Sequence, residues 1–390
     1  MQNSIDAKDS PSPPPPAQIA EGTYWLGERS PGQLLDTNSY LRRFVAGGGG
    51  GDEFVLLVDP SWASGPKRLL ERMDAVGVGG EDVDAVFINH QDPDVSTIAA
   101  KLVDEHAPDA AVLCSDDTWE LVHNYGIPEK QFVSLQDYPQ RMRLPNGQVV
   151  VPVATPFCHF MGAMMLYDPE ARVLYSGDLF SSLTAPEDGA LMASKRHLAG
   201  MRAFHQMYMP AGNALRGALR KVSDLEPTPR VVAPHHGPLI PGEFLDEVIE
   251  RLKGLKVGVE LSHRSDDTSV PGWQRVLERV VDVAESRGLD DARELVDAIS
   301  EQVRDTRGWM VAVGPRLGRP WAEQVVRLFA QRLESRDANA VRFAALEAAA
   351  DEGLATPRIE VGTESDRSAL MGDGGDANVD RRTFTASAGV

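Results

Sequence analysis

Four short segments of the sequence place imidazole or carboxylate side chains directly after an apolar run that is typical of a strand. The residues concerned are His90, Asp92, Asp94, His159, Asp178, His235 and His236. A single histidine after a strand is more often a hydrogen-bonded structural residue, and a single Gly-Asp pair is usually a turn. Histidines at three of these strand ends, together with three aspartates, are hard to explain as caps. Because these groups are suitable ligands for zinc, iron and manganese, the pattern predicts a metal site.

The elements that would position these side chains lie between residue 19 and about residue 250. Apolar runs predict strands at 37–45, 54–58, 85–88, 111–113, 149–153, 164–167, 173–175 and 231–233. Apolar residues at helical spacing predict helices at 64–76, 95–106 and 213–222. The glycine run 47–51 is expected to form a hairpin loop. Hairpins mixed with strand–helix crossovers favour an α/β fold with a mixed sheet over a doubly wound parallel one.

The rest of the chain divides into a helical region and two ends of low apolar periodicity. Helical spacing recurs at 273–287, 291–304 and 321–334. Pro320 stands where a first helical turn tolerates proline, and residues 255–350 are predicted to form a small all-α domain for packing or oligomerisation. The proline-rich segment 1–18 and the polar segment 351–390 are predicted to lack ordered structure. The predicted site therefore belongs to a domain at 19–254.

Composition limits the classes of function. The 390 residues carry a formal net charge of −19, which disfavours binding to phosphate backbones and anionic lipid. No run approaches the ~20 apolar residues of a membrane helix, and the first residues lack the order of a secretory signal. Cys114 and Cys158 are too few for a disulfide framework and fit a reducing compartment. We expect a cytoplasmic protein that binds neither nucleic acid nor membrane.

The order of the motifs resembles a known superfamily. The motifs are HQDPD at 90–94, PFCH at 156–159, SGD at 176–178 and HHG at 235–237. They resemble the metallo-β-lactamase superfamily, which implies an αββα sandwich with its metals at one edge. Its zinc hydrolases carry His-x-His-x-Asp-His, whereas Asp92 and Val95 replace the second and last histidines here. The acidic middle position is similar instead to the di-iron branch, as are the stretches 38–41, 175–180, 209–216 and 234–238.

The resemblance to the flavodiiron proteins and their flavin-free oxygen-binding relatives implies a set of ligands. One metal would take His90, Asp92 and His159. The other would take Asp94 and His236, with Asp178 bridging the two metals and His235 as the fallback for His236. Family members usually carry glutamate where Asp92 stands. Val95 removes an imidazole, so the second metal would have an open position for O2 or NO.

The same resemblance implies cofactors and partners. Two iron ions are expected, because three carboxylates stabilise a ferric pair whereas zinc has no redox chemistry; zinc and manganese remain alternatives. No flavodoxin-like domain is recognised after residue 250 and no CxxC pair is present, so we expect no FMN in this chain and an external electron donor, either rubredoxin or a flavoprotein. The chain is thus expected to bind O2 or NO as a sensor or slow reductase, and relatives imply a homodimer.

Two other functions compete with this hypothesis. A binuclear metal-dependent hydrolase of a thioester, lactone or phosphodiester would use a bridging hydroxide as its nucleophile. A metal-poor scaffold would act only through protein contacts of residues 255–350.

The surroundings of the predicted site give further expectations. An apolar wall is expected from Phe157, Phe160, Met161, Met164 and Met165, although core packing is the better interpretation of Met165. The Cys158 side chain should point away from that of His159 and pack. The remaining histidines are expected to be structural or exposed: His106, His123, His197, His205 and His263.

Overall fold

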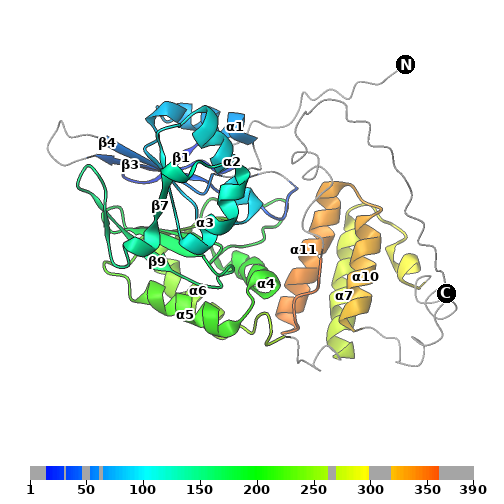
Figure 1. Cartoon of the computed structure of the whole chain (residues 1–390). Helices are drawn as coiled ribbons and strands as arrows, with labels where there is room; N and C mark the ends of the chain where they lie inside the picture. The colour runs from blue at the N-terminus through cyan, green and yellow to red at the C-terminus, as the bar shows by residue number, and fades with distance from the viewer. Residues whose placement is uncertain are drawn as a thin grey trace, which may run out of the picture.

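The chain folds into two β-sheets packed face to face, with helices on both outer faces and a helical bundle beside them (Figure 1). The computed structural model describes residues 15–29, 32–45, 53–60, 65–261, 269–297 and 318–359. No helix in these ranges is both long and apolar enough to cross a lipid bilayer.

The first sheet contains seven strands in sequential order. They are β1 (Ala17–Ala20), β2 (Thr23–Trp25), β3 (Tyr40–Val45), β4 (Glu53–Val58), β5 (Ala85–Phe87), β6 (Ala111–Cys114) and β7 (Phe132–Ser134). Strands β1 to β4 are antiparallel neighbours, and β4 to β7 are parallel neighbours. The helices between the parallel strands are α1 (Gly65–Asp74), α2 (Pro93–Glu105) and α3 (Asp116–Val122).

The second sheet has the order β13-β12-β11-β10-β9-β8. Its strands are β8 (Met142–Arg143), β9 (Val149–Ala154), β10 (Met164–Asp168), β11 (Val173–Gly177), β12 (Val231–Pro234) and β13 (Ile240–Pro241). Only β11 and β12 pair in parallel. The connection between these two strands contains α4 (Leu198–Tyr208) and α5 (Gly212–Ser223), and α6 (Gly242–Lys253) follows β13.

Alternation along the strands explains the layers, because successive side chains point to opposite faces. Leu56 and Leu166 pack between the two sheets. Their neighbours Leu57 and Met165 pack on the outer faces, against the helical layer of their own sheet. This arrangement confirms the predicted αββα sandwich and its mixed sheets. The predicted helices and strands form, although strand 37–45 begins at Tyr40 and the glycine run 47–51 lies outside the described residues.

The C-terminal helices form a bundle with its own apolar core. They are α7 (Val270–Ser286), α10 (Arg319–Ala330) and α11 (Ser335–Asp351), and residues 292–297 are also helical. The rest of the predicted helix 291–304 lies outside the described ranges. Helix α11 had no predicted counterpart because its apolar residues do not form a single stripe. It is covered by α4 on one side and by α7 and α10 on the other (Figure 1).

The ordered chain extends further than expected at both ends. Strand β1 begins at Ala17, within the segment predicted to be unstructured. Residues 354–357, within the segment predicted to be unstructured, are buried: Leu354 packs in the bundle core and Thr356 contacts Gln206 of α4. Residues 1–14 and 360–390 lie outside the described part of the chain.

A buried ion pair joins the two sheets and generates a test of the fold. Arg42 on β3 donates from Nε to Asp168 Oδ2 on β10 at 2.6 Å, and both side chains are buried. Replacing Arg42 by methionine leaves a buried carboxylate without its cation, so we expect a loss of about 3–5 kcal/mol in the free energy of unfolding, measured with urea. The control is Arg43→Met, because the Arg43–Glu53 pair is about one-third exposed and is expected to contribute less than about 1 kcal/mol. Equal losses of unfolding free energy in the two variants would contradict a stabilising role of the buried Arg42–Asp168 pair.

Candidate metal centre

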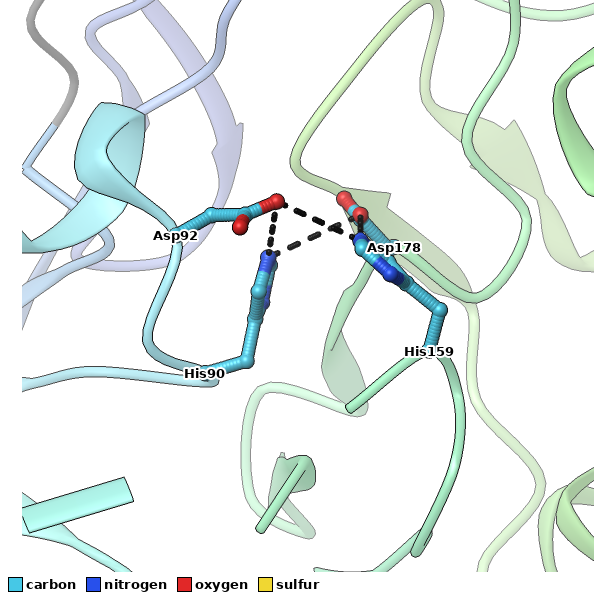
Figure 2. A group of neighbouring side chains, drawn as sticks. All are labelled: His90, Asp92, His159 and Asp178. Atoms are coloured by element: carbon cyan, nitrogen blue, oxygen red, sulfur yellow. Dashed lines mark ion pairs between the residues drawn. The ribbon is translucent and has the colours of Figure 1, made fainter. Parts of the chain in front are cut away.

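The first group of predicted ligands consists of His90, Asp92, His159 and Asp178 (Figure 2). These residues lie at one edge of the sandwich, just after β5, in the loop between β9 and β10, and just after β11. His159 Nε2 lies 2.8 Å from Asp178 Oδ2 and 3.3 Å from Asp92 Oδ2. His90 Nε2 lies 3.6 Å from each of the same two oxygens. One ligand atom from each of the four residues lies within 4.8 Å of the others, so the four side chains surround one point.

A second group lies beside the first. His235 Nε2 and His236 Nε2 are 3.4 and 3.3 Å from Asp94 Oδ2. His236 Nε2 is also 3.6 Å from Asp178 Oδ1. The two oxygens of the Asp178 carboxylate therefore face different groups, Oδ2 the first and Oδ1 the second. The structure brings all six predicted ligands together and adds His235.

Helix α2 explains why two aspartates enter the site from one short loop. Asp92 is the N-cap residue of α2, Pro93 occupies its first turn and Asp94 follows. Carboxylates are stabilised at a helix N-terminus by its dipole and free N–H groups. The proline stops the chain from continuing as a strand and starts the helix, so that both carboxylates face the centre.

Asn89 orients the ring of His90. The Asn89 side-chain oxygen lies 2.7 Å from His90 Nδ1, and the Asn89 backbone N–H donates to Asp59 Oδ1 at 2.8 Å. The Asn89 amide fills the space beside Gly177, where a Cβ would lie 2.0 Å from it. Gly177 has φ of +56°, so glycine is required there for both its conformation and its size. His90 Nδ1 is therefore hydrogen-bonded to Asn89, and its Nε2 is left to face the centre of the site.

The loop that carries His235 and His236 is held by the segment that begins at Asn38. Asn38 donates from Nδ2 to the carbonyl oxygens of Pro234 and Gly237, each at 2.8 Å, and from its backbone N–H to His235 O at 2.7 Å. His236 Nδ1 donates to the carbonyl oxygen of Asp36 at 3.0 Å, which leaves Nε2 as the atom that faces Asp94 and Asp178. The stretch 38–41, noticed in the sequence, thus supports a ligand loop.

His205 supports the turn after Asp178, a role that its sequence context did not reveal. Its Nε2 accepts from the Phe180 N–H at 3.1 Å and its Nδ1 donates to Met201 O at 2.7 Å. Burial lowers the pKa of His205 to about 4, so the ring is neutral. Phe180 has φ of +72°, and the buried imidazole holds this left-handed residue in place. No local sequence signal identifies such a contact, because α4 brings His205 there.

The other predicted structural residues behave as expected. Cys158 is buried in the core beneath the second sheet, and burial raises the pKa of its thiol to about 12. His197 is buried beside Asp188, with 2.8 Å between Nε2 and Oδ2. His123 is exposed and His106 is half-buried. His263 lies outside the described residues.

The predicted apolar wall is wrong for Phe157, Met161 and Met164, whereas Met165 packs in the core as expected. Phe160 does cover the site, since its ring stacks on that of His90 with centroids 5.7 Å apart. Met164 belongs to the core between the sheets and Met165 to the core beneath the second sheet, because β10 turns them to opposite faces. Phe157 and Met161 lie in the loop before β10 with 49% and 58% of their surface exposed.

Helix α4 provides the aromatic cover that the sequence analysis missed. The Tyr208 ring lies 5.7 Å from that of His159, and the Phe204 ring lies 5.5 Å from that of His236. Burial, together with the charges of the nearby aspartates, raises the pKa of Tyr208 to about 12. A neutral phenol therefore stands beside the first group of ligands.

The electrostatics of the site show that its carboxylates require cations. Burial alone would raise the pKa of Asp94, but the facing imidazoles of His235 and His236 hold it well below its ordinary value. Burial likewise opposes charge on His159 and His236. The facing aspartates nevertheless raise the pKa of His159 to about 10 and that of His236 to about 9.

The residues fit a pair of metal ions. Among the described residues, His90 Nε2, Asp178 Oδ1 and both ring nitrogens of His235 are buried without a hydrogen-bond partner. Buried polar atoms are nearly always satisfied, so unpaired atoms facing one another mark a place for another group. Imidazole nitrogens and carboxylate oxygens are ligands for zinc, iron and manganese. Two divalent cations would satisfy His90 Nε2, Asp178 Oδ1 and one ring nitrogen of His235, and would replace the protons on His159 and His236.

The raised pKa values predict how metal binding depends on pH. Protonated His159 and His236 stabilise the metal-free fold below the ordinary pKa of 6.5, and this contribution is lost as the pH rises through about 9 and about 10. Metal ions require deprotonated imidazoles, so their binding tightens over the same range. We expect the increase in Tm caused by metal to grow between pH 6.5 and 10, measured by calorimetry. His123→Gln, which changes an exposed ring, is the control, and a constant increase in Tm would contradict the prediction.

Comparisons with solved structures agree with the fold. The apo state of the chemotaxis sensor ODP from T. denticola is 23% identical, with a TM-score of 0.52 over 63% of this chain and 95% of that chain. Rubredoxin oxygen:oxidoreductase from Desulfovibrio gigas is 14% identical, with a TM-score of 0.53 over 61% of this chain and 60% of that one. A variant of the flavo di-iron protein from Thermotoga maritima is 17% identical, with a TM-score of 0.53 over 71% of each chain. No curated protein matches the chain.

A family model gives the more specific result. The model described as ODP family beta lactamase matches residues 35–237, which is more than half of the chain. This range contains all seven residues of the two ligand groups, from His90 to His236. The αββα sandwich and the match to this model lead to the same conclusion: the chain belongs to the ODP family of beta-lactamase-fold proteins.

Proposed function

We propose that this protein is a non-haem di-iron protein that binds O2 or NO and acts as a sensor or as a slow reductase with an external electron donor. The observation that carries the proposal is the carboxylate of Asp178, whose two oxygens face two separate groups of ligands. A single bridging carboxylate between two nitrogen- and oxygen-rich groups suits a pair of redox-active metal ions.

The proposed ligands divide between the two ions. His90, Asp92 and His159 hold the first, Asp94 and His236 hold the second, and Asp178 binds both. We add His235 to the second ion, because its Nε2 is as close to Asp94 as that of His236. His235 thereby provides a second imidazole for this ion, whereas Val95, which replaces a histidine of the zinc hydrolases, packs in the core.

The residues around the proposed ions control access to them. Two iron ions bound here would supply reversible one-electron chemistry toward O2 or NO. Asp92 has the most exposed side chain of the two groups, at 32%, so a small ligand enters from its side. The rings of Phe160 and Tyr208 cover those of His90 and His159 and limit water there, and the Tyr208 phenol is neutral because its pKa is raised to about 12.

The names of the matched proteins support the two proposed roles, sensor and reductase. One is a chemotaxis sensor, and another is a rubredoxin oxygen:oxidoreductase. Rubredoxin or a flavoprotein is accordingly the proposed electron donor, with no FMN in this chain. A hydrolase is not favoured, because Asp92 stands where the hydrolases carry histidine. The cytoplasmic location and the homodimer remain predictions from the sequence.

Metal content and an absorption spectrum test the proposal. Protein loaded anaerobically with Fe(II) should hold about two iron ions per chain and develop a visible charge-transfer band on exposure to O2. Asp178→Ala should hold fewer than two ions and lose the band, because both ions share this carboxylate. Two bound zinc ions in natively expressed protein, with no band after iron loading, would contradict the di-iron function and favour the hydrolase. A folded protein that binds no metal would favour the scaffold.

The assignment of His235 has a separate test. His235→Gln and His236→Gln should each retain one tightly bound Co(II) ion and bind the second more weakly, measured by calorimetric titration. His123→Gln removes an exposed imidazole outside the site and should bind both ions as the parent protein does. A His235→Gln variant with two unchanged affinities would remove His235 from the ligand set.

A further inference from the structure

We propose that helix α11 positions the ligand His236 through residues 32–36, so that binding of the second metal ion and docking of the C-terminal bundle are coupled. The inference rests on the proposed function for the presence of a metal ion. It concerns a part of the chain outside the family match at 35–237, since α7, α10 and α11 all follow that range.

The connection begins at the ring of His236. His236 Nδ1 donates to the carbonyl oxygen of Asp36 at 3.0 Å. The same segment is tied to the loop after Asp178, because Thr184 donates from Oγ1 to Asp36 Oδ2 at 3.2 Å and from its backbone N–H to Leu34 O at 2.9 Å. A displacement of residues 34–36 would therefore rotate the imidazole and change the direction of its Nε2.

Helix α11 holds the other end of this segment. The Asn339 side chain, only 1% exposed, donates from Nδ2 to the Gly32 carbonyl oxygen at 2.5 Å and accepts from Arg342 Nη1 at 2.7 Å. Gly32 has φ of +90°, and a Cβ on it would lie 3.2 Å from the Cβ of Arg336 on the same helix. The helix surface and the segment thus approach too closely for another side chain or a layer of water to separate them.

Apolar packing follows the same path. Leu34 lies in one buried cluster with Phe343 and Leu346 of α11 and with Phe204 of α4. The Phe204 ring in turn lies 5.5 Å from that of His236. The bundle therefore reaches His236 through two routes, one along the backbone at 32–36 and one through the Phe204 ring.

Further contacts hold the bundle against α4 (Figure 1). Thr356, which follows α11, donates from Oγ1 to Gln206 Oε1 of α4 at 2.6 Å. Arg287, which follows α7, pairs at 2.6 Å with Glu187 in the loop before α4. Helix α4 also carries Phe204 and Tyr208, which cover the site. Such a continuous network can transmit a small change at His236 to the whole interface between α4 and α11.

Linkage makes the coupling reciprocal. If the docked bundle tightens the second metal site, metal binding must strengthen the docking by the same factor. Loss of an outer hydrogen-bonding partner of a metal-bound histidine typically weakens metal binding by about 10–100-fold. The α4–α11 interface would thus change its stability with the state of the site, as a sensor requires.

Hydrogen exchange of the full-length chain tests the coupling directly. The probe is Co(II), added under anaerobic conditions, and exchange is followed by mass spectrometry. We expect loading to slow exchange severalfold in peptides from α11 and residues 32–36, and more than in α1, which serves as the internal reference. Two bound ions with no change in α11 relative to α1 would overturn the coupling and leave the proposed function intact. Failure to bind Co(II) or Fe(II) would overturn both.

A matched pair of variants on α11 separates positioning from general stability. Asn339→Ala removes the donor to Gly32 and should weaken the second Co(II) affinity about tenfold while leaving the first unchanged. Glu347→Gln is the control, because Glu347 faces Arg279 of α7 at 3.7 Å and does not contact residues 32–36. Equal affinities in the two variants would contradict the positioning role. If Asn339→Ala does not fold, the exchange measurement on the unmodified chain still decides.

Discussion

The buried carboxylate of Asp178 is the interaction on which the rest of the site depends. It is almost inaccessible to water, yet it is charged because the imidazoles of His90, His159 and His236 surround it. A buried carboxylate is costly unless cations and hydrogen bonds compensate it. Asp92 and Asp94 add negative charge to the same volume. Cations at this edge of the sandwich are therefore a requirement of the fold itself, whether they are protons on histidine or metal ions.

The scaffold fixes two of the histidines and the turn after Asp178 through hydrogen bonds from outside the two ligand groups. Asn89 holds one histidine, the carbonyl oxygen of Asp36 holds another, and His205 holds the turn that follows Asp178. These contacts come from the first sheet, from the segment before β3 and from α4, so both halves of the sandwich contribute. Outer partners of this kind set the orientation and basicity of metal-binding histidines. Of the motif stretches outside the ligands, 38–41 provides such support through Asn38.

The C-terminal bundle contacts the segment that orients a candidate ligand of the site. A closed sandwich could bind metal and a small ligand without any further element, but α11 is packed against the segment that orients His236. The interface between α4 and α11 is buried and directly adjacent to the aromatic cover of the site. The proposed ligand His236 and the docked helix α11 therefore both contact residues 32–36 and Phe204. This is the physical arrangement by which a ligand-binding site could control an interaction surface.

The sequence by itself determined the types of the candidate ligands, their order and the strands that carry them, because residue chemistry and apolar periodicity are local properties. It also identified Asp92 as the departure from the zinc hydrolases. Only the tertiary structure decided that His235 joins His236: neighbours in an extended segment should point apart, but the chain turns at Gly237, where φ is +76°. The roles of the aromatic cover, of His205 and of α11 could not be predicted from the sequence either, because they depend on partners that are distant in the sequence. Packing between distant segments leaves no local pattern.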